Sequence, residues 1–199
     1  MAITNGYITL DLLKSSLQIP TDDTQDDDFM ELAIESASRQ IDAGTERQFF
    51  DTTETRVFTP RDSITCEIDD LTNLTTLKSS SDANGTFDIT WAAKDYQLEP
   101  LNGLAGGIET PATLIRAVDE YLFPTDLQEA TVQVTGTFGY TPVPIQIKQA
   151  TLILASRLFE RRNSPLGIAG FSDIGAVRVS RFDSDIENLI QPFRRIRMA

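Results

Sequence analysis

One stretch of the chain, residues 141–167, limits what the rest can fold into because it encodes a long helix with a wide apolar surface. Pro142 and Pro144 fit the first turn of a helix, where a missing backbone N–H costs nothing. Pro165 and Gly167 are typical of the residues that follow a helix end. We therefore expect a helix of about five to six turns between these signals.

The apolar residues of this expected helix form two adjoining rows, and together the rows are wider than the stripe of an ordinary amphipathic helix. One row holds Ile147, Ala150, Leu154 and Leu158, and the other holds Ile145, Leu152, Ala155 and Phe159. Two interpretations stay open. Either this is the central core helix of a small domain, or one row packs within the subunit and the other meets a neighbouring copy.

The charge of the chain is strongly negative, with 17 basic against 30 acidic residues and a net charge of −13. Such a balance disfavours a surface that grips nucleic-acid phosphates. Residues 1–55 hold 3 basic and 12 acidic side chains, whereas residues 156–199 hold 8 and 5. Opposed charge at the two ends suggests partners on opposite sides.

The length of 199 residues is enough for one domain, or for one domain with an inserted second layer. No apolar run approaches the roughly 20 residues of a membrane helix, and the first ten residues lack the pattern of an export signal. We therefore expect a soluble protein with no membrane partner. Cys66 is the single cysteine, which excludes an intramolecular disulfide and agrees with a reducing compartment.

Two helices are expected near the N-terminus. Thr9 is a plausible N-cap for a short helix that Pro20 closes. The acidic run 21–28 then lies before and within the first turn of a second helix, where the helix dipole stabilises carboxylates. Its expected apolar face repeats every four residues, at Phe29, Ala33, Ala37 and Ile41. Leu32 and Ile34 widen this face, and Gly44 ends it. A calcium loop starting at Asp22 would need glycine and glutamate where Asp27 and Ala33 stand, so we interpret the run as a solvated helix start.

From about residue 53 the pattern changes to the alternation of β-strands. Ile64, Cys66 and Ile68 share one face, which makes Cys66 a packed core residue. The expected strands are 55–58, 64–68, 74–80, 86–91, 95–100, 113–118 and 130–138. Short strands with turn residues between them indicate an antiparallel sheet or sandwich.

Three segments keep two interpretations each. Residues 101–111 are either a hairpin end or a loop that orders on a partner. Residues 121–126 are either core or an exposed contact patch. After a short helix near residues 183–190, the C-terminal tail is either frayed or docks on an acidic groove, because apolar and basic residues interleave there: Phe193, Arg194, Arg195, Ile196 and Arg197.

The chain contains no histidine, which removes the usual general base, the commonest metal ligand and every serine–histidine or cysteine–histidine arrangement. The run 170–175, GFSDIG, is one residue too long for a nucleophile elbow. No phosphate-binding glycine loop is present. We therefore expect no catalysis, no cofactor and no metal, and the residues alone predict an α+β interaction protein.

Three stretches resemble the head-to-tail connector proteins of tailed bacteriophages, in their adaptor or head-completion group. They are ITLDLLKSSLQIPTDD with DDDFMELAIESASRQIDAGTERQF, then VTGTFGYTPVPIQIKQATLILASRLFERRNSPLG, and finally GAVRVSRFDSDIENLIQPFRR. The resemblance covers residues 3–55 and 131–195. It implies an α+β fold in which residues 1–55 and 140–199 form a small helical bundle with a C-terminal tail. Residues 56–139 are then an inserted antiparallel β layer.

The same resemblance implies a structural role without enzymatic activity. The subunit would belong to a twelvefold ring in the virion neck, assembled in the host cytoplasm. That ring would bind the portal protein, extend the DNA channel without specific DNA binding, and seat the stopper or a tail-completion protein. Alternatives are a stopper or tail-completion protein of the neck, an acidic host-directed module that mimics DNA, and an enzyme that uses only carboxylates and metal.

The resemblance and the charge pattern together suggest two sets of site residues. The expected portal-binding residues are those of the tail: Phe193, Arg194, Arg195, Ile196 and Arg197. The expected subunit interface pairs basic residues of the long helix with acidic residues of the second helix: Arg157, Arg161 and Arg162 with Asp26, Asp27, Asp28 and Glu31.

Overall fold

The computed structural model describes residues 3–81, 85–105, 108–118, 120–125, 130–162 and 184–195. The chain divides into two compact units, which we call the helical unit, Met1–Arg47 with Val143–Ala199, and the β unit, Gln48–Pro142. Helices form at both ends of the chain and an antiparallel sheet forms between them. The predicted α+β fold is therefore confirmed.

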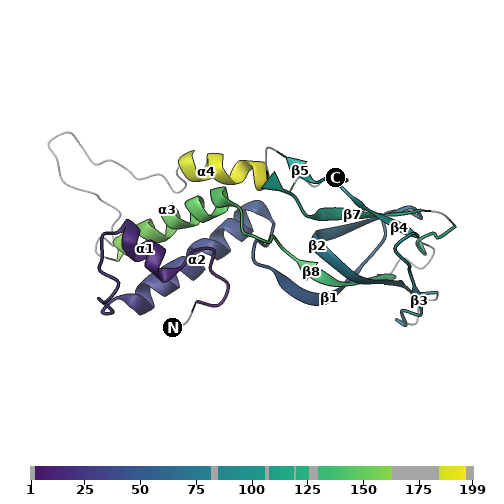
Figure 1. Cartoon of the computed structure of the whole chain (residues 1–199), viewed down its shortest axis with the longest axis horizontal. Helices are drawn as coiled ribbons and strands as arrows, with labels where there is room; N and C mark the ends of the chain where they lie inside the picture. Colours follow the sequence, from purple (N-terminus) through teal and green to yellow (C-terminus); the bar gives the residue numbers. More distant parts are fainter. Residues whose placement is uncertain are drawn as a thin grey trace. The chain divides into compact units, whose positions relative to one another are not determined.

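The helical unit is a small bundle. Its elements are α1 (Leu10–Ser16), α2 (Asp27–Thr45), α3 (Ile145–Arg161), α4 (Ser184–Ile190) and a 3-10 turn (Gln191–Phe193). Figure 1 shows α1, α2 and α3 packed together and α4 lying along α3. The two ends of the chain thus build one unit, although the whole β unit lies between them in sequence.

The helix ends follow local chemistry. The Thr9 hydroxyl accepts a hydrogen bond from the Leu12 N–H at 3.3 Å, so Thr9 is the N-cap that the sequence predicts. Two other ends differ from prediction. Helix α2 runs through Gly44 and ends at Thr45, because Glu46 takes the left-handed conformation with φ 55°. Helix α3 has Pro144 as its N-cap and 17 residues, just under five turns.

The core of the helical unit uses one stripe of α3, not two complete rows. The buried residues of α3 are Ile147, Ala150, Thr151, Ala155 and Phe159. Of these, Ala155 and Phe159 pack with residues of α1 and α2, among them Leu13 and Ile34. Leu152, Leu154 and Leu158 are half-buried beside this core, and Ile145 is 77% exposed.

The β unit is one antiparallel sheet with strand order β1-β8-β2-β7-β4, and β3 also pairs with β2. The strands are β1 (Thr52–Phe58), β2 (Thr65–Ser79), β3 (Ile89–Thr90), β4 (Tyr96–Glu99), β7 (Ala112–Ala117) and β8 (Val132–Phe138). A separate hairpin joins β5 (Leu104–Ala105) to β6 (Ile108–Glu109). Residues 101–111 therefore contain a hairpin, one of the two interpretations left open.

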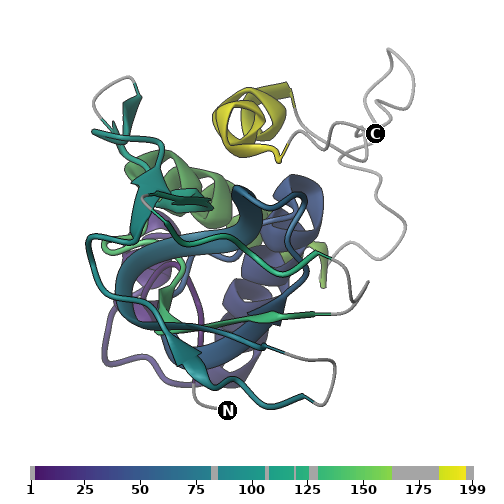
Figure 2. The ribbon, with the colours of Figure 1, turned by 90° about the vertical axis from the view of Figure 1, so that its right-hand side faces the viewer.

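Strand β2 joins two of the expected strands into one of 15 residues. Its first part pairs with β7, where Cys66 lies opposite Ile115, and its later part pairs with β8, where Leu77 lies opposite Val134. Register shifts along the β8 pairing mark bulges, which bend a strand and increase its twist. Viewed end-on in Figure 2, the sheet accordingly curves instead of lying flat.

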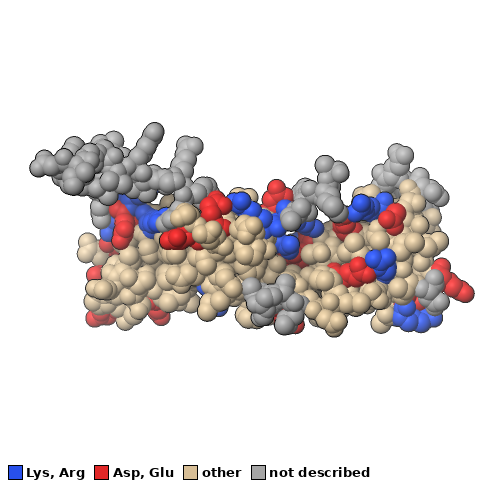
Figure 3. All heavy atoms as spheres, turned by 90° about the horizontal axis from the view of Figure 1, so that it is seen from above, with Lys and Arg blue, Asp and Glu red and all other residues tan. Residues whose placement is uncertain are grey.

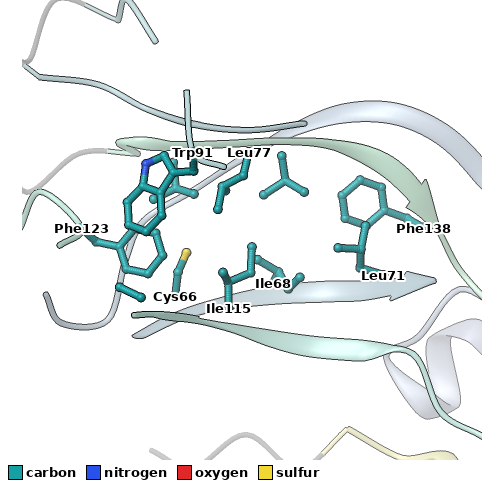
Figure 4. Packing of buried hydrophobic residues seen from close by; sticks show 11 residues of the cluster. Cys66, Ile68, Leu71, Leu77, Trp91, Ile115, Phe123 and Phe138 are labelled. Carbon is teal, nitrogen blue, oxygen red and sulfur yellow. The ribbon is translucent and has the colours of Figure 1, made fainter. Parts of the chain in front are cut away.

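The curvature makes one sheet enclose its own core. In Figure 4, Leu77 and Trp91 lie on one side of this core, and Cys66, Ile68 and Ile115 lie on the other. Cys66 is fully buried, and burial, with a smaller effect of Glu67, raises the pKa of its thiol to about 12. The prediction that Cys66 is a packed core residue is confirmed.

The single tryptophan decides the open question about residues 121–126. The ring of Trp91 stacks on Phe123 with centroids 4.6 Å apart, and it donates from Nε1 to Ser79 Oγ at 2.9 Å. Phe123 is therefore core, whereas Leu122 beside it is 62% exposed. The expected strand at 86–91 shortens to β3, because the Asp88 carboxylate accepts hydrogen bonds from the Ser81 N–H and hydroxyl and so is held outside the strand pairing.

Gly136 permits the close pairing of β8 with the bulged part of β2. A Cβ atom at this position would lie 2.3 Å from the Asn73 carbonyl oxygen and 2.8 Å from Leu71 Cδ1. Gly44 in α2 differs, because a Cβ there would lie 3.5 Å from Ile190 Cδ1, an ordinary contact. The two glycines thus allow the same substitution to be tried in opposite environments.

We predict that Gly136→Ala destabilises the protein by about 1–3 kcal/mol, since backbone and core must shift to admit the methyl group. Gly44→Ala, the matched control, should stabilise it by about 0.5–1 kcal/mol, because alanine favours a helix. Urea unfolding of both variants measures the difference. Equal effects of the two substitutions would contradict the close β2–β8 approach.

Candidate functional site

The candidate site lies in the helical unit, where the basic end of α3 meets the acidic start of α2. Arg162 donates from Nη1 to Asp26 Oδ1 at 2.6 Å and from Nη2 to Asp26 Oδ2, so the pair is bidentate. The guanidinium also lies over the rings of Phe159, at 4.2 Å, and Phe29, at 5.6 Å. The hydrogen bonds to Arg162 lower the pKa of Asp26.

This pair forms within one chain, where it ties α2 to α3. Of the other expected interface residues, Arg161 and Asp28 are exposed, and Arg157 and Glu31 are half-buried. The structure thus gathers most of the expected set at one end of the α2–α3 pair. Its role between subunits stays a prediction.

Asp27 makes a contact that the sequence reasoning missed. Lys14 of α1 is only 2% exposed, and its ammonium group forms an ion pair with Asp27 at 2.6 Å. The same group donates to the carbonyl oxygens of Asp23, at 2.8 Å, and Thr21, at 3.3 Å. The start of α2 and the acidic run before it are therefore held on α1 by one buried cation. A signal was available, because Lys14 lies on the same helical face as its apolar neighbours in α1.

An apolar groove lies next to the Arg162 pair, between α2 and α3. It measures about 240 Å³, and its lining includes Phe29, Leu32, Ala33, Leu158, Phe159 and Arg162. The prediction that Phe29 belongs to the core face of α2 is wrong, because Phe29 is 59% exposed, and Leu32 beside it is 49% exposed. Ala33, Ala37 and Ile41 are buried as predicted, and Met30 and Ile34 complete the core face.

The expected portal-binding tail is only partly described, since Ile196 and Arg197 lie outside the described residues. Phe193 is buried, and with Ile186 and Ile190 it forms the inner side of α4 and the turn after it. The Arg194 side chain binds Glu187 at 2.7 Å, and the Arg195 N–H donates to the Thr45 carbonyl oxygen at 2.9 Å. Phe193 would therefore have to leave its own subunit before its ring touched a partner.

A second hollow, of about 510 Å³, lies in the β unit beside Asp51, Glu109, Tyr140 and Thr141. Two carboxylates among hydroxyl side chains do not complete a metal site. Within the described ranges, no three Cys, Asp or Glu side chains gather closely enough to hold a metal ion. In that part of the chain we also find no helix with the length and apolarity needed to cross a membrane.

The negative charge is unevenly divided between the units. The β unit carries 15 acidic and 5 basic residues, and the helical unit carries 15 and 12. On the face that Figure 3 shows, basic and acidic side chains are interspersed among uncharged residues. The excess negative charge therefore belongs mainly to the β unit, while the helical unit is close to balanced.

No protein-family model and no curated protein matches the chain. Solved structures of gene transfer agent particles do contain similar chains. In the neck of the empty particle computed with C6 symmetry, a chain is 18% identical with a TM-score of 0.61, and the match covers all of this chain and 95% of that chain. In the virion of the native particle, a chain is 19% identical with a TM-score of 0.61, and the match covers 95% of that chain. In the neck of the native particle computed with C12 symmetry, a chain is 17% identical with a TM-score of 0.55, and the match covers 94% of that chain. Both matches cover all of this chain.

At such low identity the likeness is one of fold. The resemblance to connector proteins is confirmed at that level, because two of these three structures are particle necks and the match runs over the full length of the chain.

We predict that Asp26→Asn lowers the melting temperature near neutral pH, because it removes the partner of Arg162. The folded-state pKa of Asp26 is lowered from its ordinary value of 3.8, so its contribution is fully present above that value and is lost as the pH falls through the lower folded pKa. The gap between wild type and variant should therefore close in acid. Exposed Asp22→Asn is the control, and an Asp26→Asn gap that does not begin to narrow as the pH falls below 3.8 would contradict the ion pair.

We predict that Lys14→Met destabilises the protein by about 1.5–3 kcal/mol, since it leaves the Asp27 carboxylate and two carbonyl oxygens without their charged donor. The exposed lysine of α3 provides the control: Lys148→Met should change stability by less than about 0.5 kcal/mol. Chemical denaturation of both variants tests this. Equal losses of stability from Lys14→Met and Lys148→Met would contradict the role of Lys14 in holding the start of α2 on α1.

Proposed function

We propose that this chain is a non-enzymatic structural subunit of a phage neck, an adaptor that joins the portal to the stopper or tail. The observation that carries the proposal is the fold likeness over the whole chain to chains of particle necks. One neck was computed with C6 symmetry and the other with C12 symmetry. These rotational symmetries support a ring of copies of this chain, twelve in the virion. The ring is then located between capsid and tail and is assembled in the host cytoplasm.

The negative charge of the β unit supports the proposal that the ring lines a channel for DNA. With 15 acidic against 5 basic residues, it repels phosphates more than it binds them. A channel wall needs this property, because DNA must slide past it without specific contacts. The ring therefore extends the DNA channel and does not read or hold the duplex.

The way in which the C-terminal tail is anchored supports a contact of this tail with the portal. The buried Phe193 anchors the last described turn on its own subunit, and the Arg195 N–H adds a hydrogen bond to the end of α2. From this anchor we propose that the basic side chains of Arg194, Arg195 and Arg197, with Ile196, reach acidic and apolar pockets of the portal. Phe193 then serves the contact indirectly, by fixing where the tail begins.

Co-assembly with the portal protein of the same genome tests the proposal, read by electron microscopy of the purified complex. We compare the full chain with a chain that ends at Arg195, which keeps the Phe193 anchor, and with one that ends at Pro192, which loses it. We expect the full chain to cap the portal with a ring and both shortened chains to bind at least about tenfold more weakly.

Other outcomes separate the alternatives. Rings with all three chains would keep the adaptor role and move portal docking to the helical bundle. A chain that ignores the portal but binds a completed adaptor ring would be a stopper or tail-completion protein. A monomer that binds a DNA-binding host protein instead would be a DNA mimic, and the adaptor proposal would fail.

A further inference from the structure

The groove beside Arg162 exposes more apolar surface than the fold of the helical unit needs. Phe29 and Leu32 are 59% and 49% exposed and lie one turn apart on the same face of α2. The inward face of α2 is already complete without them, since Met30, Ile34 and Ile41 are at most 1% exposed. Adjacent exposed apolar side chains with no part in the core mark an interaction surface.

The other sides of α2 are already occupied. Asp27 binds Lys14 and so places α1 on one side, and Glu35 accepts the Asn5 N–H at 2.9 Å and so places the N-terminal segment on the next. Successive residues turn by about 100° around a helix, so Asp27 and Phe29 point roughly 160° apart. The groove and α1 therefore lie on opposite sides of α2.

The outer face of α1 carries a surface that complements the groove. Leu12 is 43% exposed there, while its neighbours Leu13 and Lys14 are buried. Asp11, next to Leu12, is exposed too. The groove offers apolar walls with the exposed Arg161 at the end of α3, whereas α1 offers one apolar side chain beside a carboxylate.

We propose that the partner of this groove is a second copy of the chain, and that Leu12 of one subunit enters the groove of the next while Asp11 meets Arg161. Leu12 of α1 and the groove lie on opposite sides of α2. Each subunit can therefore bind one neighbour through its groove and another neighbour through its Leu12. Such head-to-tail contacts close into a ring when the rotation between copies allows it. This inference rests on the proposed ring and identifies the surfaces that join its subunits.

The local charges give the contact its direction. Arg162 is bound to Asp26 and lies over Phe29, so it holds the groove wall in place. Arg161 follows Glu160 at the exposed end of α3, where an incoming carboxylate finds a cation. Two grooves facing each other would oppose arginine to arginine, which disfavours a twofold contact.

Cross-linking in the assembled ring tests the contact directly. Leu12→Cys and Leu32→Cys are combined, the ring is assembled on the portal, and a short bismaleimide is added. We expect a ladder of covalent multimers on a denaturing gel, and no ladder from either single variant. Native Cys66 does not compete, because it is buried and its pKa is about 12.

A ring that forms but yields no ladder would overturn the Leu12–groove contact and leave the adaptor role intact. Failure of the wild-type chain to form any ring would overturn both.

Substitution gives an independent measure. Leu32→Asp should raise the protein concentration needed for ring formation by at least about tenfold, because a charge cannot be buried in the apolar groove. The monomer should melt as wild type does, since Leu32 is outside the core. Ile145→Asp, at an apolar position of α3 that is 77% exposed and far along the helix from the groove, is the matched control and should assemble normally.

Charge reversal tests the pairing of side chains. Asp11→Arg and Arg161→Asp should each weaken assembly, and the two together should restore it. Loss of assembly with Ile145→Asp as great as with Leu32→Asp, or a double reversal no better than the single ones, would overturn the proposal.

Discussion

The packing of α2 against α3 is the constraint on which the rest of the helical unit depends. It joins two parts of the chain that are separated in sequence by the 95 residues from Gln48 to Pro142. Closing so long an insertion costs little more entropy than closing a short one, because the cost grows only with the logarithm of its length. The apolar contacts around Ile34 and Ala155 can therefore hold the bundle together, with the Asp26–Arg162 pair fixing the ends of both helices.

Much of the fold could be predicted because helices and strands reveal their period and their caps. The error at Phe29 has a geometric origin. Residues four apart drift by about 40° at each step, so a row of four cannot keep both of its ends on the core, and here Phe29 at its start points away while Ile41 at its end is buried. The buried row alternates steps of four and three, Met30, Ile34, Ala37 and Ile41, and so stays on one side. The merging of two expected strands into β2 was out of reach, because bulges leave no clear sign in a sequence.

The candidate site was harder to predict than the fold. Charge complementarity pointed to Asp26 and Arg162 but does not tell a contact within a chain from one between chains, and the structure shows the former. The interleaved tail had the same ambiguity, since Phe193 turns inward while Arg194 is exposed. Lysine is ordinarily expected in solvent, but the long aliphatic chain of Lys14 lets it reach from α1 to the start of α2 and place its charge against Asp27.

The burial of Trp91 has a practical consequence. It is the chain's single tryptophan, and it lies in the core of the β unit against Phe123. Its intrinsic fluorescence therefore reports on the sheet alone, whereas the far-ultraviolet circular dichroism signal comes mainly from the helices. Coincident transitions by the two probes would mean that the units melt as one cooperative body, and separate transitions that each has a stability of its own. The sequence thus carries a built-in reporter of how strongly its two halves are coupled.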